Sequence, residues 1–373
     1  MPSEPVTVLV TCLGGALSVE VVQALAGQRA LPIRVIGTDR DERTAAAQFV
    51  DACHRVPDGA DPDYIASLLE ICAAERVQVV IARADEEVEA IAASRGAFER
   101  AGIRCAVPEA QTVRLLRHKT KLLKFLEQSG IRVAGFKEAA TAQELTDAAA
   151  ALGYPARPVV VKPCTARGGR GALLVDAATD PLREWFTERA PWRTTLETLA
   201  SAWGVRPDRP ALLVMEYLPG DAYDIDVLSQ QGTVICSGIR KRYNPRGIPF
   251  TGCMTETDDA IQGKVEAAIA ALKLDFGSDV DLAIAEDGEP QILEINPRFS
   301  GSIAGSLRAG VNFPLELVRM ALGLPVVPQQ CAPGVETTPY LLTTGRALGS
   351  ARHSFAGADG AGSVAGRKVT HGR

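Results

Sequence analysis

The chain has 373 residues and a formal net charge of −5, from 40 basic and 45 acidic side chains. Hydrophobic residues make up 46% of it and charged residues 23%, which is typical of a globular protein and excludes a disordered or fibrous one. The mild acidity argues against a nucleic-acid-binding protein. No apolar run approaches the ~20 residues of a membrane span, and the amino terminus lacks the features of a signal peptide. We therefore expect a cytoplasmic protein that binds neither nucleic acid nor membrane.

The cysteines and histidines limit the kinds of metal site and catalytic site that the chain can form. The eight cysteines are scattered, without a CxxC pair or a Cys/His cluster. We interpret them as core residues in a reducing compartment rather than as disulfides or zinc ligands. The four histidines, His54, His118, His353 and His371, fit no Ser-His-Asp arrangement. We expect lysines, arginines and carboxylates to carry any chemistry.

Residues 1–115 alternate between short apolar runs and helical patterns. The expected strands are 6–11, 33–37, 77–82 and 103–107, and the expected helices are 16–25, 63–73 and 85–100. This β-α-β order predicts an α/β fold, in which a Rossmann-like domain has a parallel sheet with helices on both faces.

Gly14 and Gly15 lie at the turn after the first expected strand. Asp39 follows the second strand, where a ribose-binding acid would lie, but the turn does not match the GxGxxG pattern of a dinucleotide site. Two other interpretations stay open. The glycines could simply allow a tight turn, or their backbone amides could hold an anionic part of a substrate.

The remainder of the chain mixes helices and strands. The expected helices are 109–129, 141–152, 185–203, 258–272 and 313–322, and Thr141 and Glu144 have the spacing of a capping box. The expected strands are 158–162, 171–175, 211–216, 223–228, 233–239, 280–285 and 291–295. Beyond about residue 350 the chain is rich in Ala, Gly, Ser and basic residues, so we expect a disordered tail.

One candidate phosphate site follows the strand at 158–162. That strand delivers Lys162, and a loop containing Gly168 and Gly169 comes after it. Glycine lets backbone amides approach phosphate oxygens, and a lysine supplies a compact positive charge to them. The lysine precedes the glycines, so this is not a Walker A loop. Taken alone, the stretch would be an ordinary hairpin with an exposed lysine.

A second group of residues supports a phosphate-binding role for the first. Glu294, Asn296 and Arg298 occupy alternate positions, so they share one face if the strand continues that far. Carboxylate and amide oxygens suit Mg²⁺, and arginine suits a phosphate. Asp281 lies within the preceding apolar strand, where a carboxylate is costly unless it is paired or binds a metal. Together these residues favour a metal site.

These residues resemble the ATP-grasp superfamily, in particular one half of the carbamoyl-phosphate synthase large subunit and biotin carboxylase. The resemblance covers roughly residues 5–325, and its most specific sign is Glu-Ile-Asn-Pro-Arg at 294–298, followed by Phe-Ser-Gly-Ser. It implies a two-lobed α+β ATP-grasp module over residues 116–330 after the N-terminal domain. The lid lobe would span about 130–215 and the catalytic lobe about 216–330, and residues 331–373 would form a C-terminal extension.

The resemblance also implies a role for each matching residue. Lys119, with Lys121 as its rival, and Lys162 would bind nucleotide phosphates. The lid loop would contribute Thr165, Gly168 and Gly169, and the adenine hinge Glu216, Tyr217 and Leu218. Asp281, Glu294 and Asn296 would hold Mg²⁺ or Mn²⁺, and Arg298 and Lys162 would be catalytic.

Some positions depart from the family or stay open. Ala222 stands where the family has a glutamate for the ribose, and Asp221 or Asp224 could replace that contact. We expect Arg240 and Arg242 to face either a phosphate or substrate, or else the solvent. We expect Gly14, Gly15, Ser300 and Ser302 to contact substrate or phosphate, because they lie near the expected pocket.

We therefore expect an enzyme that uses ATP and Mg²⁺ to join a small-molecule carboxylate and an amine, such as two amino acids, through an acyl phosphate. Phosphoryl transfer needs positioning and charge neutralisation more than a protein nucleophile, so the scarcity of histidine is no obstacle. Two alternatives are a bicarbonate-activating enzyme like carbamoyl-phosphate synthase and an inactive nucleotide-binding module. An NAD-dependent dehydrogenase is disfavoured. A homodimer is the expected assembly.

Overall fold

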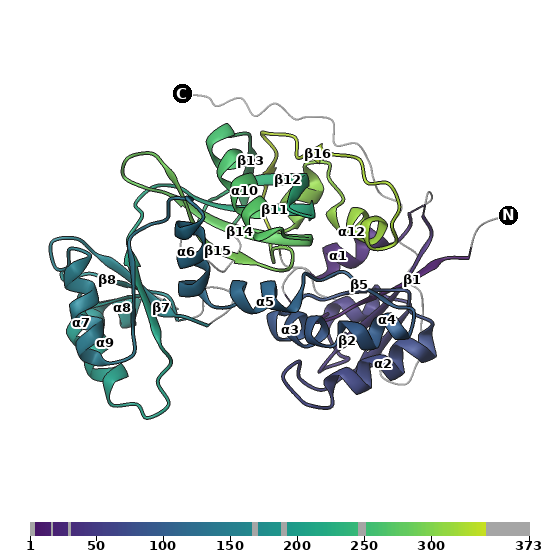
Figure 1. The fold of residues 1–373 in the computed structure, drawn as a ribbon, viewed down its shortest axis with the longest axis horizontal. Coiled ribbons are helices and arrows are strands. Elements are labelled where there is room, and N and C mark those ends of the chain that lie inside the picture. Colours follow the sequence, from purple (N-terminus) through teal and green to yellow (C-terminus); the bar gives the residue numbers. More distant parts are fainter. Residues whose placement is uncertain are drawn as a thin grey trace, which may run out of the picture. The chain divides into compact units, whose positions relative to one another are not determined.

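The computed structural model describes residues 4–15, 18–28, 31–165, 171–187, 192–244 and 251–340. Two predictions, the lid-loop glycines Gly168 and Gly169 and the disordered tail beyond about residue 350, lie outside these residues. The chain divides into two units, Met1–Pro339 and Tyr340–Arg373. The first unit holds three sheets and their helices (Figure 1).

The first sheet confirms the predicted parallel α/β arrangement. Its five strands lie in the order β3-β2-β1-β4-β5, and all of their pairings are parallel. The strands are β1 (Val6–Val10), β2 (Ile33–Asp39), β3 (Ala52–Arg55), β4 (Val79–Ile81) and β5 (Arg104–Cys105). The helices are α1 (Ser18–Leu25), η1 (Ala45–Gln48), α2 (Tyr64–Glu75), α3 (Asp85–Ala93) and α4 (Arg95–Arg100).

Alternation along β1 explains why helices cover both faces of this sheet. Val8 and Val10 pack in one cluster with α1, whereas Leu9 packs in another with α2 and α3. The single helix predicted at 85–100 is two helices, because Ser94 is both the C-cap of α3 and the N-cap of α4. The short strand β3 was not predicted.

The second sheet has the order β6-β10-β7-β8-β9. Its strands are β6 (Phe136–Ala139), β7 (Val159–Pro163), β8 (Leu173–Val175), β9 (Arg193–Thr194) and β10 (Leu212–Glu216). Its helices are α7 (Ala142–Ala151), α8 (Pro181–Thr187) and α9 (Leu196–Gly204). The predicted capping box is present, since the Thr141 side chain accepts the Glu144 amide and the Glu144 side chain accepts the Thr141 amide.

The third sheet positions most of the candidate site. Its order is β15-β14-β11-β12-β13-β17, and β16 pairs with β12. The strands are β11 (Ala222–Gln230), β12 (Thr233–Arg242), β13 (Cys253–Glu256), β14 (Phe276–Ile284), β15 (Pro290–Asn296), β16 (Gln329–Gln330) and β17 (Glu336–Thr337). The associated helices are α5 (Ala110–Leu116), α6 (Lys119–Gln128), α10 (Asp259–Leu272), α11 (Ala304–Arg308) and α12 (Phe313–Ala321).

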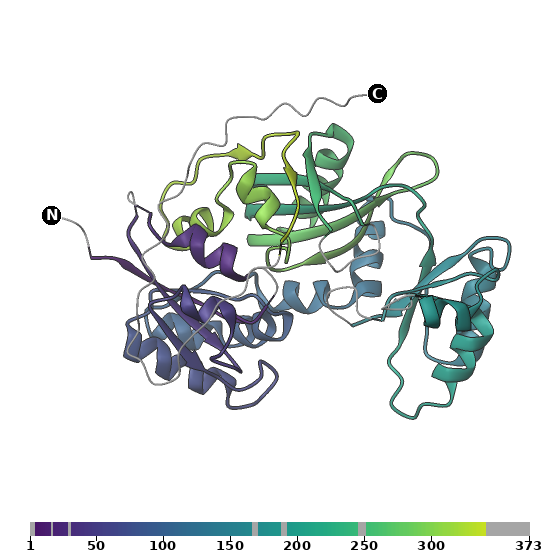
Figure 2. The ribbon, with the colours of Figure 1, turned by 180° about the vertical axis from the view of Figure 1, so that it is seen from behind.

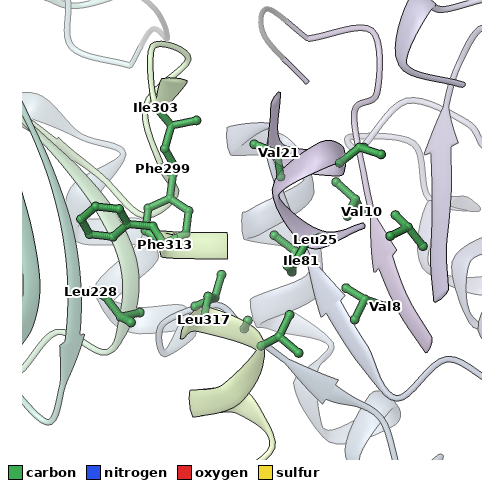
Figure 3. Close-up of a cluster of buried hydrophobic side chains, with 14 of the residues drawn as sticks. Val8, Val10, Val21, Leu25, Ile81, Leu228, Phe299, Ile303, Phe313 and Leu317 are labelled. Atoms are coloured by element: carbon green, nitrogen blue, oxygen red, sulfur yellow. The ribbon is translucent and has the colours of Figure 1, made fainter. Parts of the chain in front are cut away.

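A shared hydrophobic cluster joins the first sheet to the end of the third. Phe299, Ile303, Phe313 and Leu317 lie opposite the side chains of β1, α1 and β4 (Figure 3). The rings of Phe299 and Phe313 meet edge to face, with centroids 5.6 Å apart. Helices α1 and α12 lie side by side in both views (Figures 1 and 2). The packing therefore places the carboxyl end of the parallel sheet near the residues that follow β15.

Candidate functional site

One face of the third sheet gathers the charged residues. The strand register places Asp281 opposite both Asp224 and Glu294, and Asp279 opposite both Asp226 and Asn296. Residues two apart along a strand share a face, so these carboxylates and the amide form a continuous polar surface. The residues between them, such as Ile225, Val280 and Ile295, pack against α10 in an apolar cluster. The alternation thus separates the core from the candidate site.

Glu294 meets the first of the two predicted nucleotide lysines. Lys119 Nζ lies 3.1 Å from Glu294 Oε2, and both side chains are buried. The rival Lys121 is exposed. Burial would raise the pKa of Glu294, but Lys119 and Lys162 outweigh it and lower the pKa to about 2. The carboxylate is therefore charged and matched to two cations.

A break in the predicted helix 109–129 brings Lys119 to this place. The stretch forms two helices, α5 and α6, and Lys119 is the first residue of α6. Its backbone amide, which has no partner within the helix, donates to the carbonyl of Cys164 at 2.9 Å. Cys164 follows β7, which carries Lys162. The Lys162 ammonium donates to the carbonyl of Leu293 at 3.4 Å, and burial lowers its pKa.

An acidic cluster lies beside these lysines. Asp224, Asp279 and Asp281 each offer an oxygen within 4.8 Å of the others. Burial raises the pKa of Asp279 to about 7, and the neighbouring Asp224 adds to the rise. Burial also raises the pKa of Asp281 well above its usual range. Arg242 donates to both Asp224 and Asp281 and partly neutralises the negative charge of the cluster.

The predicted metal ligands fit a hard divalent cation. Asn296 Nδ2 donates to Glu294 Oε1 at 3.4 Å and to Asp279 Oδ2 at 3.5 Å, so the Asn296 amide lies among carboxylate oxygens, the ligands that Mg²⁺ prefers. Among the described residues, the buried Asp279 Oδ1 accepts no hydrogen bond. Sequence reasoning missed Asp279 and gave Asp224 a different role. The same two-residue spacing that selected Glu294 and Asn296 places Asp279 on the face of Asp281, so that signal was present.

Arg298 lies two residues beyond the end of β15, yet it remains at this cluster. Its Nη1 lies 3.1 Å from Asp279 Oδ2, and its Nε lies 3.2 Å from Oδ1 of Asp85, the first residue of α3. Burial would lower the pKa of Arg298, but Asp85 and Asp279 outweigh it and raise the pKa. The guanidinium is a permanent charge held by two carboxylates.

Three predicted phosphate or substrate contacts are instead buried in a polar network. Arg240 is fully buried, which excludes the solvent-facing alternative; its Nη1 donates to the Ser302 carbonyl at 3.0 Å, and its Nη2 lies 2.9 Å from Asp226. The Ser300 amide donates to Asp226 at 3.1 Å, and the Ser302 hydroxyl donates to Asp224 at 3.2 Å. These contacts favour a structural role for Arg240, Ser300 and Ser302.

The predicted hinge lies at the end of β10. The Glu216 side chain accepts the Gly135 amide at 2.8 Å, and its own amide donates to the Gly135 carbonyl at 2.9 Å. Tyr217 is 38% exposed, Leu218 is partly buried, and Thr165 at the start of the lid loop is exposed.

Both candidates for the ribose contact, Asp221 and Asp224, already interact with other side chains of the chain. Asp221 pairs with Lys241 at 2.5 Å, whereas Asp224 lies in the acidic cluster. Ala222, where the family has a glutamate, is buried. The structure therefore offers Asp221, which is partly exposed, as the candidate that lies outside the metal cluster.

The amino-terminal glycine turn is tightly built. The Gly14 amide donates to Asp39 Oδ2 at 2.7 Å, and the Gly15 amide donates to the Cys12 carbonyl at 3.0 Å. A side chain at Gly14 would place its Cβ 3.0 Å from the Thr44 methyl group and 3.1 Å from Asp39. Asp39 is thus engaged by the turn itself, which supports the tight-turn interpretation.

Two stretches of the chain match models of known protein families. Residues 208–339 match a family model described as ATP-grasp in the biosynthetic pathway with Ter operon, and residues 8–106 match a PylC-like N-terminal domain. None of the described helices is long and apolar enough to cross a membrane. The eight cysteines, all within the described part of the chain, form no disulfide.

The matches to individual relatives cover different shares of this chain and of the relatives themselves. It is 25% identical over 240 residues to the carbamoyl phosphate synthase large chain of Pseudothermotoga lettingae, covering 62% of this chain but only 19% of that protein. It is 29% identical over 352 residues to the formate-dependent phosphoribosylglycinamide formyltransferase of Methylococcus capsulatus, covering 91% of this chain and 82% of that protein.

Among solved structures, the L-amino acid ligase from Bacillus licheniformis superposes with a TM-score of 0.62 at 18% identity, over 86% of this chain and 76% of that one. At that identity the likeness concerns the fold. Together the matches confirm the resemblance expected from the sequence: the chain is similar to ATP-grasp ligases, and a stretch that matches a PylC-like N-terminal domain precedes the stretch that matches the ATP-grasp model.

Proposed function

We propose that the protein joins a small carboxylic acid to an amine, with ATP as the energy source and Mg²⁺ or Mn²⁺ as the metal. The observation that carries this proposal is the convergence of Lys119 and Lys162 on Glu294, beside the acidic cluster and Arg298. This arrangement offers positive charge for phosphates next to oxygen ligands for a cation. The relatives named above support the same class of reaction.

The reaction would proceed in two steps. A carboxylate oxygen of the acid attacks the γ-phosphorus of ATP, the bond to the bridging oxygen breaks, and ADP leaves. The amine nitrogen then attacks the carbonyl carbon of the acyl phosphate, loses a proton, and expels inorganic phosphate. The product is an amide, and the sum of reactants exceeds it by one water.

The residues of this chain supply positioning and charge for those steps. Lys119 and Lys162 would neutralise phosphate oxygens, and Arg298 would lie at the transferred phosphoryl group. Asp281, Glu294 and Asn296, joined by Asp279, would hold the cation, which when bound neutralises phosphate charge. The hinge at Glu216, Tyr217 and Leu218 would hold the adenine, and the loop from Thr165 through Gly168 and Gly169 would cover the phosphates.

Bicarbonate activation is the second candidate, and the similarity to the carbamoyl phosphate synthase large chain favours it. In that case bicarbonate replaces the organic acid in the first step. An inactive nucleotide-binding module is less well supported, because the charged residues of the site are all retained and mutually paired.

The test is ADP release with ATP and Mg²⁺ against a panel of amino acids, other small acids including formate, amines and bicarbonate, with mass detection of products. ADP release that needs one acid and one amine, with a product lighter than their sum by one water, supports the ligase. Stimulation by bicarbonate alone supports the second candidate. Nucleotide binding without turnover across the panel contradicts both.

Glu294→Gln should abolish Mg²⁺-dependent turnover, because it removes the carboxylate that faces the two lysines and belongs to the metal set. Glu286→Gln, at an exposed turn between β14 and β15, is the matched control and should leave turnover unchanged. Near-normal activity of Glu294→Gln would contradict the metal assignment. Domain boundaries at 115 and 330, a cytoplasmic location and a homodimer stay predictions.

A further inference from the structure

Asp85 links the parallel sheet to the candidate catalytic arginine. It is the first residue of α3, shortly after β4, and its Oδ1 lies 3.2 Å from Arg298 Nε, 213 residues further along the chain. The Asp85 side chain is 10% exposed and that of Arg298 is 14% exposed. A contact this buried is little screened by solvent, so its charge matters more than that of a surface pair.

Asp85 lies at the N-terminal end of a helix and faces a guanidinium. The residue lies in the first turn of a nine-residue helix, where the helix dipole favours negative charge. Asp85 is also the first carboxylate that raises the pKa of Arg298 against the effect of burial. Asp85 and Arg298 thus form an ion pair between α3 and the segment after β15.

Arg298 needs such a support because the sheet does not hold it. β15 ends at Asn296, so no ladder hydrogen bond fixes the backbone at position 298. Two carboxylates hold different nitrogens of the planar guanidinium: Asp85 holds Nε and Asp279 holds Nη1. Two such points define the orientation of the plane. Asp279 belongs to the acidic cluster, where a cation would compete for it, whereas Asp85 lies outside that cluster.

We propose that Asp85 is a positioning residue that orients Arg298 toward the transferred phosphoryl group. The inference rests on the proposed function, in which Arg298 acts at that group. It gives the parallel-sheet domain a direct part in the chemical step. The packing of α1 and β4 against Phe299 and Phe313 holds Asp85 at the required distance, so the two parts of the chain form one catalytic arrangement.

The test compares Asp85→Asn, Asp85→Ala and Asp85→Glu with the wild type, using the acid–amine pair that gives the highest ADP release in the panel. Asn keeps the shape and a hydrogen-bond acceptor but removes the charge. Ala removes both, and Glu restores the charge on a longer side chain. Asp58→Asn is the matched control, because Asp58 makes an exposed pair with Arg40 at 2.8 Å in the same domain.

We expect kcat to fall about 10-fold for Asp85→Asn and up to about 100-fold for Asp85→Ala, since small misplacements of a catalytic group have effects of this size. The KM for ATP should change less than about 2-fold, because the lysines that contact the nucleotide are untouched. Asp85→Glu should recover part of kcat, and Asp58→Asn should match the wild type. Equal kcat in all folded variants, or loss that follows the melting temperature alone, would overturn the proposal.

A second measurement does not depend on turnover. The Arg298 Nε–H resonance, assigned by its loss in Arg298→Lys, should exchange slowly with solvent in the wild type and rapidly in Asp85→Ala. Unchanged exchange would refute the contact. If the wild type shows no turnover with any pair, the proposed ligase function fails, and the catalytic role of Asp85 fails with it. An active wild type with an active Asp85→Ala refutes only the positioning role.

Discussion

Replacing Glu87 by glutamine should change how the stability of the protein depends on pH. Glu87 lies in the first turn of α3, is 7% exposed, and accepts hydrogen bonds from the Thr11 hydroxyl and the Ala84 amide. Burial raises its pKa from 4.5 to about 7, although the bonds from Thr11 and Ala84 oppose the rise. The folded protein therefore keeps a proton on Glu87 that the unfolded chain has already lost.

The direction and size of the effect follow from this difference. Between about pH 4.5 and pH 7 the folded state binds more protons than the unfolded state, so the free energy of unfolding falls as the pH rises. Each pH unit corresponds to about 1.4 kcal/mol, which gives a total of roughly 3 kcal/mol. Below that window both states are protonated, and above it both are ionised, so the slope from Glu87 disappears.

Urea unfolding of the wild type and Glu87→Gln across this window measures the effect. Glutamine is close in shape and keeps an oxygen to accept the same hydrogen bonds, but it cannot ionise. The difference in unfolding free energy between variant and wild type should grow by roughly 3 kcal/mol in favour of the variant as the pH rises. Glu99→Gln, an exposed position on α4, is the control and should leave the wild-type profile unchanged. Parallel profiles for Glu87→Gln and the wild type would refute the reasoning.

Two further predictions concern the charged face of the third sheet. Lys119→Ala should weaken ATP binding by at least about 10-fold, because it removes a positive charge that faces the phosphates and leaves the buried Glu294 with Lys162 as its remaining cation. The exposed Lys121→Ala should change binding less than about 2-fold. Calorimetric titration with ATP compares the two variants, and equal effects would contradict the assignment of Lys119. Arg242→Ala should lower the melting temperature without metal, since Asp224 and Asp281 lose a shared partner, and should give a larger Mg²⁺-dependent rise than the wild type. Equal metal responses would argue against a cation at that cluster.

Local patterns in the sequence were enough to predict much of the fold. Strand and helix alternation predicted the parallel sheet, because hydrophobic periodicity is a property of neighbouring residues. The capping box at Thr141 was predicted for the same reason, since all of its atoms lie within one helical turn. The break between α5 and α6 was missed, because the amide of Lys119 finds its partner 45 residues away, at Cys164.

The residue types of the candidate site also came from the sequence. The spacing of Glu294, Asn296 and Arg298 indicated metal and phosphate chemistry, and the resemblance to ATP-grasp proteins that these residues carry is confirmed by the comparisons. The same period of two could have selected Asp279, which lies two residues before Asp281. Asp279 was not predicted because it belongs to no recognised motif.

Only the tertiary structure decided which of these groups meet. Strand register placed Asp224 and Asp279 beside Asp281, and the ladder between two strands depends on chain segments far apart in sequence. Arg240, a candidate for binding phosphate, is fully buried and pairs with Asp226 instead. The pair of Asp85 with Arg298 depends on how two sheets pack, and no local pattern contains that information. The sequence by itself determined the residue types and their local elements, and long-range packing determined their partners.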